Sequence, residues 1–464
     1  METDMQWAVK QYGGVHLGDV RRSMRAVQIA VHMARRPADM LPAQMEKWKD
    51  QKAAYRFLDN PAVSHEALSQ PHWEATRREG SGEGKTTLMI QDITELDYTA
   101  HQETEGLGPI GNYRGQGMYV HTTLAVEAAG GTVLGLAYQQ AWVRENVRHK
   151  GNETRTQRSK RKDKQSERWV QAVKMIGKAP AETRWVHVAD RECDIYDFFE
   201  AVHENDADFC VRIVQNRRVG EWEEEDPHYL ISDIQQLPAM GTRMVEVPAK
   251  AGQSSRNANL SVSWQEVVLR SPRNRSSPEN RLGLWAIRVW ESSPPPEVEA
   301  IEWLLLTSVP VEKLEDAQER ILWYTYRWLV EEYHSCLKTG CSMEKRQLQD
   351  GARLQRLLGF LAILAVRLLQ LRDVSRTTPN LRAVEVVQPV LVQIMAYQTK
   401  KDPNSMTMAA FWRSVGQIGG FPGRKSDGQP GWKRLWHGWL RLLDWADGVH
   451  FAQNLPPLQD VGNP

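Results

Sequence analysis

The sequence predicts an α/β protein with a mixed core between two helical regions. Residues 86–190 alternate short apolar, β-branched runs with one amphipathic stretch, which is the pattern of strands with a helix between them. Residues 213–308 contain further short alternating runs separated by Gly and Pro turns, which indicates additional strands. Both ends of the chain, residues 1–69 and 373–464, carry helical periodicity. At 464 residues the chain is long enough for about two or three domains.

The composition is that of a globular protein. Hydrophobic residues make up 41% of the chain and charged residues 25%, and 59 basic against 58 acidic residues give a net charge of +1. This balance alone gives no indication of nucleic-acid binding, so a prediction of DNA binding must rest on local clusters of basic residues. The four cysteines form neither a CxxC pair nor a zinc-ligand spacing, which indicates free thiols in a reducing cytoplasm.

Nothing in the sequence points to a membrane. The first residues lack an apolar signal region, and the longest apolar run, residues 357–366, is too short to span a bilayer. We therefore expect a cytoplasmic protein with no membrane association.

The first 69 residues predict a small domain of basic helices. One helix follows Gly18-Asp19, and a second spans about residues 42–58. The basic residues of interest on them are Arg21, Arg22, Arg25, Lys52 and Arg56. Basic side chains on short helices suit contacts with DNA phosphates and entry into a groove. The alternative is an ordinary solvated basic surface, and composition alone leaves both readings open.

Residues 80–86, with the sequence GSGEGKT, resemble the end of a phosphate-binding loop. The first glycine is one residue too close to the lysine, and a strand follows the loop where it should precede it. We therefore expect a flexible connector here and no nucleotide cofactor.

Residues 86–190 predict four strands and one helix. The strands are expected at residues 86–92, 118–126, 133–142 and 185–190, and the helix at residues 167–178. Strand, strand, strand, helix, strand is the order of the RNase H-like fold, in which the first and fourth strands are neighbours. The first strand ends on Asp92 and the fourth on Asp190, so the two carboxylates would meet at one sheet edge. Either aspartate alone is typical of a turn, but together they indicate a metal site.

A stripe of polar residues runs along residues 321–340, which have the pattern of a single helix. Tyr324, Arg327, Glu331 and Lys338 fall within about 60° of one another, at roughly 100° per residue. The opposite, apolar face would carry Leu322, Tyr326, Leu329, Tyr333 and Leu337. The helix would then direct a hydroxyl, a guanidinium, a carboxylate and an ammonium at one target. Taken alone, the stripe could equally be a solvated face with an ion pair.

The order Tyr-x2-Arg-x3-Glu-x6-Lys resembles the signature of the bacterial cut-and-paste DDE transposases of the insertion-sequence-four family. Residues 91–94 (QDIT) and 190–194 (DRECD) are similar to the family's blocks around its two aspartates. Residues 18–22 and 54–57 are similar to its N-terminal, end-binding domain. The resemblance covers nearly the whole chain.

The resemblance implies a set of site residues. Asp92, Asp190 and Glu331 would hold two divalent cations about 4 Å apart, with Mg²⁺ preferred and Mn²⁺ able to substitute. The phosphate beside the cleaved bond would be held by Tyr324, Arg327 and Lys338. Trp303 would stack on a base flipped out of the duplex, although a Trp that opens an apolar strand is normally a core residue. Arg212 would lie near bound DNA.

The resemblance also implies a domain organisation and a function. A helical DNA-binding domain is expected at residues 1–69, an RNase H-like catalytic domain at 70–372 with a β insertion at about 213–308, and a helical dimerisation domain at 373–464. The protein would cut transposon ends through a hairpin intermediate and join the 3′-OH ends to target DNA. It would act as a homodimer in a paired-end complex, at the bacterial nucleoid.

Three interpretations stay open. An RNase H-like nuclease or resolvase would keep the three carboxylates, and a DNA-binding inhibitor form would lack catalysis. The stripe on residues 432–446 is either a local core or a dimer seam, and the family favours the seam; it comprises Trp432, Leu435, Trp436, Trp439, Leu442 and Leu443. Residues 144–168, with ten Lys or Arg against four acidic residues, are either a solvated loop or an extra DNA contact.

Overall fold

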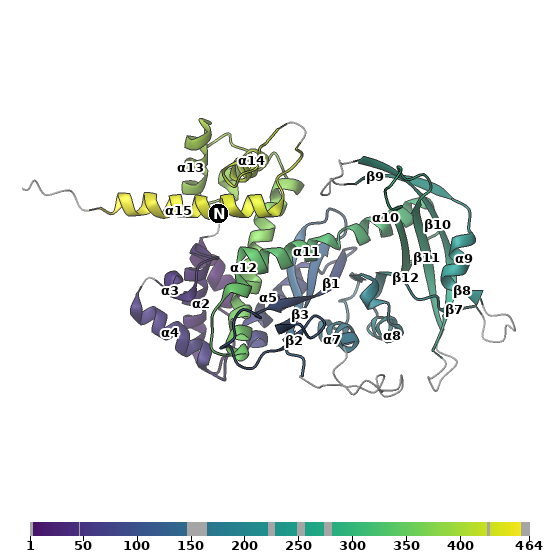
Figure 1. Cartoon of the computed structure of the whole chain (residues 1–464), viewed down its shortest axis with the longest axis horizontal. Coiled ribbons are helices and arrows are strands. Elements are labelled where there is room, and N and C mark those ends of the chain that lie inside the picture. Colours follow the sequence, from purple (N-terminus) through teal and green to yellow (C-terminus); the bar gives the residue numbers. More distant parts are fainter. Residues whose placement is uncertain are drawn as a thin grey trace, which may run out of the picture. The chain divides into compact units, whose positions relative to one another are not determined.

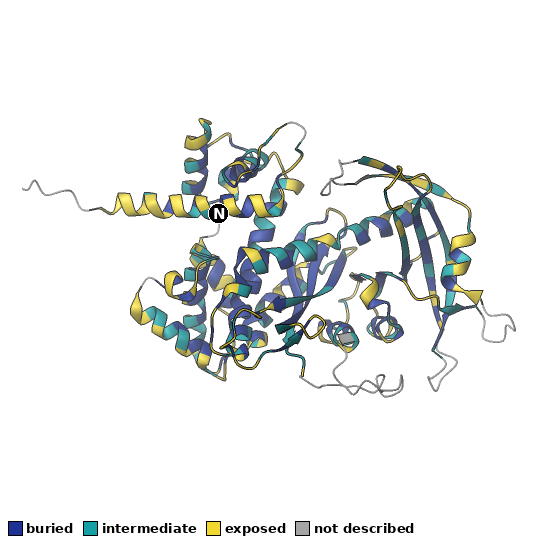
Figure 2. Cartoon of the chain, in the orientation of Figure 1, coloured by how far each residue is buried: buried dark blue, intermediate teal, exposed yellow. Residues whose placement is uncertain are grey.

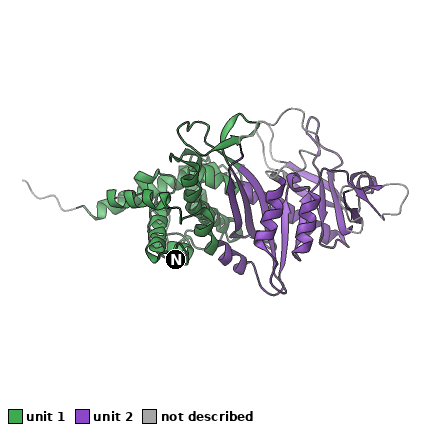
Figure 3. Cartoon of the chain, turned by 90° about the horizontal axis from the view of Figure 1, so that it is seen from below, with its two compact units in different colours: residues 1–72, 95–118, 332–464 green, residues 73–94, 119–331 purple. Residues whose placement is uncertain are grey.

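A computed structural model of the chain describes residues 3–45, 47–145, 165–220, 228–247, 256–272, 281–424 and 427–455. The chain divides into two compact units, coloured separately in Figure 3. Unit 1 consists of residues 1–72, 95–118 and 332–464, and unit 2 of residues 73–94 and 119–331. Most of the basic segment at residues 144–168 lies outside the described residues.

Unit 2 is built on a mixed β-sheet. Its strands are β1 (Thr86–Asp97), β3 (Gly115–Glu127), β4 (Val133–Trp142), β5 (Arg184–Ala189), β6 (Asp208–Arg212), β7 (Arg218–Val219), β8 (His228–Tyr229), β9 (Gly241–Val247), β10 (Arg256–Arg270), β11 (Arg281–Glu291) and β12 (Glu302–Thr307). Among the described residues, the strand order is β3-β1-β5-β6-β12-β11-β10-β7-β8, with β4 beside β3 and β9 beside β10. Strands β1 and β3 reach into unit 1 at one end.

The five strands β4, β3, β1, β5 and β6 follow the order of an RNase H-like core. β5 is parallel to both β1 and β6, while β3 and β4 form an antiparallel hairpin whose turn contains Gly130 and Gly131. The predicted contact between the first and fourth strands of the core is therefore confirmed as the β1–β5 pair.

Helices cover both faces of this core (Figure 1). His121 packs against Trp169 of α7 (Gln165–Ile176), and His187 packs against Phe198 of α8 (Tyr196–Glu204). On the other face, the Cys210 thiol meets the carbonyl of Arg320 in α10 (Leu314–Thr325). Because successive side chains of a strand point to opposite faces, such short alternating runs can bury both sides (Figure 2).

Residues 213–308 continue the same sheet. β10 and β11 form a long antiparallel pair, and β12 joins it to β6 of the core. α9 (Leu230–Gln236) packs on β10 and β11 (Figure 1). The strands predicted in this region are therefore present and extend the central sheet.

Strand β1 is longer than predicted. It was expected to end on Asp92 but continues to Asp97. Ile93 packs against the hydrophobic core of unit 2, and Leu96 is fully buried. Apolar side chains therefore continue along the strand beyond Asp92. Asp92 thus lies inside strand β1 and not at its end.

The segment predicted as one helix, residues 321–340, is broken. Its parts are the end of α10, then α11 (Trp328–Ser335) and a π-helical turn (Cys336–Gly340). At the break, the Thr325 hydroxyl donates to the Leu322 carbonyl at 2.6 Å. The Leu329 amide bonds to the Tyr326 carbonyl, only three residues back. A hydroxyl that bonds to a helix carbonyl bends the helix, and residue spacing does not reveal this.

The break changes which side chains of this segment are buried. On the predicted apolar face, Leu322, Tyr326 and Leu329 are only half-buried. Tyr324, predicted on the polar face, is buried, while the neighbouring Trp328 is 59% exposed. The division of the segment into one buried and one polar face was therefore wrong for the part that precedes Val330.

Unit 1 is mainly helical. Its helices are α1 (Asp4–Tyr12), α2 (Val20–Arg35), α3 (Leu41–Gln44), α4 (Trp48–Asp59), α12 (Gly351–Thr377), α13 (Pro389–Thr399), α14 (Met408–Ile418) and α15 (Trp432–Gln453), and α5 (His65–Glu79) begins in it. Its short strand β2 (Gly108–Ile110) pairs with the start of β3. α12 forms the centre of this unit, and the buried Tyr12 hydroxyl donates to the carbonyl of Gly359.

Two predictions for unit 1 need correction. The helix expected at residues 42–58 is split into α3 and α4, with Gln44 donating to the Arg36 carbonyl at the end of α3, a tertiary contact that periodicity does not report. The aromatic stripe of α15 is a local core and not a free dimer seam. Trp436 and Trp439 are 2% and 7% exposed, and Trp439 stacks on Trp412 of α14.

Within the described parts of the chain, no helix is both long enough and apolar enough to cross a membrane.

The two glycines of the β3–β4 turn provide a matched test of the packing under the helix break. Gly131 has a φ of +72°, and a Cβ there would approach the Tyr326 ring to 2.6 Å. We expect Gly131→Ala to lower the free energy of unfolding by about 1–3 kcal/mol, through left-handed strain and overpacking. Gly130→Ala, where a Cβ meets nothing closer than 3.6 Å, should be nearly neutral. Urea unfolding followed by tryptophan fluorescence measures both, and equal losses would contradict this packing.

Candidate active site

Asp92 and Asp190 lie side by side on neighbouring strands. The last pair of the parallel β1–β5 ladder joins Ile90 to Val188, and each aspartate lies two residues further along the chain. Asp92 is still within β1, whereas Asp190 directly follows the end of β5. Equal spacing from a paired position puts both side chains on the same face of the sheet. The carboxylates predicted to meet at one sheet edge are therefore brought together.

Local hydrogen bonds orient both carboxylates. Asp190 caps the short 3-10 turn at residues 191–193, and its Oδ1 accepts the Glu192 amide at 2.9 Å. Asp92 Oδ1 accepts the amide of Ile93 at 2.9 Å. Carboxylate oxygens are the ligands that hard divalent cations prefer.

Asp92 lies close to other carboxylates. Burial, and then the nearby charge of Asp190, raise the pKa of the Asp92 carboxyl from its ordinary 3.8 to about 7. Glu331 acts in the same direction and Arg327 opposes it. Carboxylates repel one another at close range, and a bound divalent cation is the usual way in which such a cluster is stabilised. The donor set, all oxygen, fits a hard cation such as Mg²⁺ or Mn²⁺.

Glu331 is engaged with Arg327 at the start of α11. The guanidinium and the carboxylate are 2.7 Å apart, and their side chains are 12% and 38% exposed. Arg327 also lies over the rings of Tyr324 and Trp328, at 5.9 and 5.1 Å from their centroids. Among the described residues, no three His, Cys, Asp or Glu side chains stand at metal-ligand spacing. In this structure the ion pair directs the Glu331 carboxylate toward the Arg327 guanidinium.

Trp303 and Arg212 both contact Tyr324, whose ring lies beneath the Arg327 guanidinium. The Trp303 ring meets the Tyr324 ring edge-on, with centroids 5.5 Å apart, and it is only half-buried in β12. Arg212 hydrogen-bonds to the Tyr324 side chain and donates to the Glu302 carbonyl at 3.3 Å. Burial raises the pKa of the Tyr324 hydroxyl, so it stays protonated. Trp303 is therefore only partly enclosed by the protein.

Lys338 lies in unit 1, on the π-helical turn. Its ammonium pairs with the Glu344 carboxylate at 3.5 Å. Its charge also lowers the pKa of Asp97, after the larger effect of hydrogen bonds from Thr99. The described contacts of Lys338 are thus with acidic residues of its own unit.

The basic residues of the N-terminal helices differ in how available they are. Arg22 donates to the Leu17 carbonyl at 2.7 Å and Arg25 pairs with Asp50 at 3.4 Å, so both help to hold the helices together. Arg21 is 87% exposed beside Asp19, and Lys52 and Arg56 are exposed on α4. Trp48, at the start of α4, is 73% exposed and was not predicted as a surface residue. Its position in a basic helix was the only feature of the sequence that could have indicated this.

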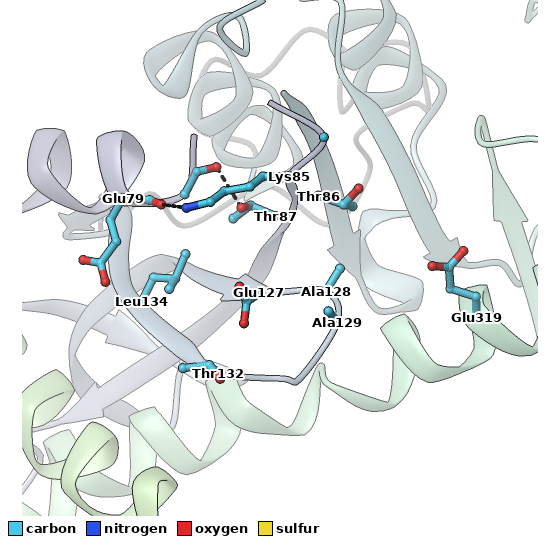
Figure 4. Close-up of a pocket in the computed structure, with 12 residues that line it drawn as sticks. Glu79, Lys85, Thr86, Thr87, Glu127, Ala128, Ala129, Thr132, Leu134 and Glu319 are labelled. Carbon is cyan, nitrogen blue, oxygen red and sulfur yellow. Dashed lines mark hydrogen bonds between the residues drawn. The ribbon is translucent and has the colours of Figure 1, made fainter. Parts of the chain in front are cut away.

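The loop that resembles a phosphate-binding loop lies beside a separate cavity. Hydrogen bonds hold residues 80–86 in place, with the Gly82 amide donating to the Thr183 hydroxyl at 2.9 Å, so the prediction of a flexible connector was wrong. An open cavity of about 490 Å³ lies here, at the end of β1 opposite to Asp92. Figure 4 shows Lys85 directed at the Glu79 carbonyl, with acidic side chains around the cavity.

Comparison with known protein families identifies the class. Residues 4–63 match the family described as transposase DNA-binding, and residues 147–367 match the transposase DDE domain. The chain is therefore a DDE transposase, a DNA-binding nuclease and strand transferase with an RNase H-like core. Residues 363–456 match the transposase Tn5 dimerisation domain. The chain thus belongs to the Tn5-like DDE transposases of the insertion-sequence-four family, as its motifs predicted.

Three general properties follow from membership of this family. DDE domains use divalent metal ions, the DNA-binding domain implies a DNA partner, and the dimerisation domain implies a homodimer. In α15 the side chains available to a partner lie beyond the buried stripe, where Trp445 and Phe451 are 38% and 69% exposed.

The raised pKa of Asp92 predicts a pH-dependent stability. Because the folded state holds this proton more tightly than the unfolded chain, the protein loses stability as the pH rises from about 4 to about 7, and the loss persists above that. Asp92→Asn has no proton to lose. We expect the variant to be more stable than the parent by about 4 kcal/mol at pH 8, and about equal at pH 4.

Chemical denaturation in buffer with EDTA, repeated across this pH range, measures the difference between parent and variant. Added Mg²⁺ should reduce the gap at pH 8, since a cation would stabilise the parent's ionised carboxylate. A gap that does not change with pH would contradict the charge cluster.

Proposed function

We propose that this chain is a cut-and-paste transposase that cleaves transposon ends through a hairpin and joins the 3′-OH ends to target DNA. The observation that carries the proposal is the meeting of Asp92 and Asp190 on adjacent strands, with Glu331 and Arg327 beside them. Three carboxylates with an arginine suit phosphoryl transfer, in which metal ligands and a phosphate-binding cation must act at one point.

The three carboxylates are proposed to hold Mg²⁺, with Mn²⁺ able to substitute. Bound there, the metal would activate the attacking oxygen and stabilise the leaving oxygen of the phosphodiester. The match to the DDE domain begins at residue 147, so the inclusion of Asp92 is supported by its register with Asp190 and by its raised pKa.

Arg327 is proposed to exchange partners when DNA binds. A guanidinium holds a phosphate bidentately, so the phosphate beside the cleaved bond would compete with Glu331 for it. Glu331 would then be free to act as a metal ligand. Tyr324, held by Arg212 beneath the guanidinium, would keep Arg327 oriented during the exchange. Lys338 would add a second, weaker phosphate contact.

Trp303 is proposed to stack on a base that leaves the duplex, which allows the sharp bend of a hairpin. Its ring is half-buried and is supported from one side by Tyr324, so its position is fixed while part of its surface stays open. It is carried by the sheet at residues 213–308, which we propose to be an inserted subdomain of the catalytic domain.

The remaining domains are proposed to deliver DNA and pair the two ends. Residues 1–69 would bind the transposon end, through Arg21, Lys52 and Arg56 on exposed helix surfaces and with Arg22 and Arg25 nearby. Residues 70–372 would form the catalytic domain and residues 373–464 the dimerisation domain, so that two protomers assemble on two ends.

Incubating the purified protein with end DNA and Mg²⁺ tests the proposal. The parent should yield hairpin-ended fragments, whereas Asp92→Ala, Asp190→Ala and Glu331→Ala should each bind end DNA without nicking it. Glu79→Gln, at the end of α5 beside the separate cavity, serves as the control and should cleave like the parent. Nicking without hairpins in the parent would favour a resolvase-like nuclease, and binding without nicking an inhibitor form.

Trp303→Ala separates the two cleavage steps in the same assay. We expect it to nick the first strand at a near-normal rate but to form hairpins slowly, because stacking contributes roughly 1–3 kcal/mol once the base is out. Trp285→Ala, a half-buried tryptophan of the adjacent strand β11, should affect both steps equally or neither. Equal loss at both steps in Trp303→Ala would assign Trp303 to folding alone.

A further inference from the structure

A buried ion pair lies directly behind the Asp190 turn. Asp194 is fully buried, and its Oδ1 accepts the Nη2 and Nε groups of Arg217 at 2.6 and 3.1 Å. Arg217 is itself 13% exposed and lies over the ring of the buried Phe199. The proposed chemistry uses neither residue, although Asp194 belongs to the DRECD block.

Asp194 also holds the main chain of a second loop. Its Oδ2 accepts the amides of Val214 and Gln215 at 2.9 and 2.7 Å. Its carbonyl accepts the Gln215 side-chain amide and the Arg217 guanidinium, at 2.7 and 2.6 Å. One buried carboxylate therefore closes the loop that follows β6 onto the turn that follows β5, with its charge neutralised and both oxygens satisfied.

The turn held in this way carries Asp190. The Asp190 carbonyl accepts the Cys193 amide, and the Arg191 carbonyl accepts the Asp194 amide, at 3.1 and 3.3 Å. Three residues thus separate the anchored Asp194 from Asp190, and those residues form a hydrogen-bonded 3-10 turn capped by Asp190 itself. The hydrogen bonds of this turn connect the anchored Asp194 to Asp190, so anchoring Asp194 restricts where the Asp190 backbone can lie.

The loop on the other side of the ion pair begins next to Arg212. Residues 213–217 follow Arg212 at the end of β6, and Arg212 hydrogen-bonds to Tyr324 beneath Arg327. The same ion pair therefore links the metal-ligand side of the site to its phosphate-binding side.

We propose that Asp194 and Arg217 are positioning residues that set the Asp190 carboxylate for metal binding. The inference rests on the proposed role of Asp190 as a metal ligand. Groups that orient a ligand typically change metal affinity or activity by about 10–100-fold when they are removed. A purely structural ion pair would lower stability and leave the metal affinity of the folded protein unchanged.

The test compares Asp194→Asn with the parent by Mn²⁺ binding, followed through the EPR signal of free Mn²⁺ without DNA. Asparagine keeps the size of the side chain but removes the charge, and its amide group faces donors where the carboxylate accepts. We expect Mn²⁺ affinity to fall about tenfold or more, and the Mg²⁺ concentration for half-maximal first-strand nicking to rise by a similar factor. Binding of end DNA in EDTA should be unchanged.

Glu291→Gln is the matched control. Glu291 is a buried carboxylate of the same unit that forms a two-pronged pair with Arg256, on β11 and β10 and away from the carboxylates. We expect it to lower the melting temperature as Asp194→Asn does, with Mn²⁺ affinity within about twofold of the parent. Arg217→Lys keeps the charge but loses the fork, so it should fold and show an intermediate loss of affinity.

Parent-like Mn²⁺ affinity in both folded variants, Asp194→Asn and Arg217→Lys, would overturn the inference. If Asp194→Asn fails to fold, Arg217→Lys alone decides between loss of affinity and parent-like affinity. A parent that binds no Mn²⁺ and nicks DNA in EDTA would contradict the proposed function instead, so the two failures are distinguishable.

Discussion

The parallel pairing of β1 with β5 places two carboxylates at the same level of one sheet face, and the surrounding structure compensates for the repulsion. Burial and the neighbouring Asp190 disfavour the ionised form of the Asp92 carboxyl and raise its pKa to about 7. Arg327 opposes this charge; its guanidinium lies over the rings of Tyr324 and Trp328 and is paired with Glu331. The site is therefore prepared for additional positive charge, which a divalent cation supplies in this family.

This arrangement gives Arg327 two successive partners. Pairing with Glu331 partly offsets the charge of a third carboxylate, which still raises the pKa of Asp92. A DNA phosphate is a better match for the guanidinium fork than a single carboxylate in an (i, i+4) pair, which contributes little on its own. Binding of DNA and completion of the metal site would then be coupled, so that Glu331 joins the two aspartates as a ligand only when a phosphate is in place.

Alternation and turn residues predicted the first four strands and the helix between them, because these depend on local periodicity. The contact between β1 and β5 is not local and was predicted from the order of elements in the RNase H-like fold. The break after Thr325 was not predictable, since it arises from one hydroxyl–carbonyl hydrogen bond and from a ring packed on Gly131. The α15 stripe was misassigned because an aromatic face has the same pattern whether it packs on α14 or on a second chain. Arg217 carried no sequence signal, since its partner lies across a turn.

The most direct measurement of the central claim is anomalous X-ray scattering from crystals grown with Mn²⁺ and end DNA. We expect an Mn²⁺ ion bound by oxygens of Asp92 and Asp190, with Glu331 as a further ligand and the Arg327 guanidinium bound to a DNA phosphate. An Mn²⁺ ion bound away from these carboxylates would contradict it, as would a filled metal site in which Glu331 remains paired with Arg327.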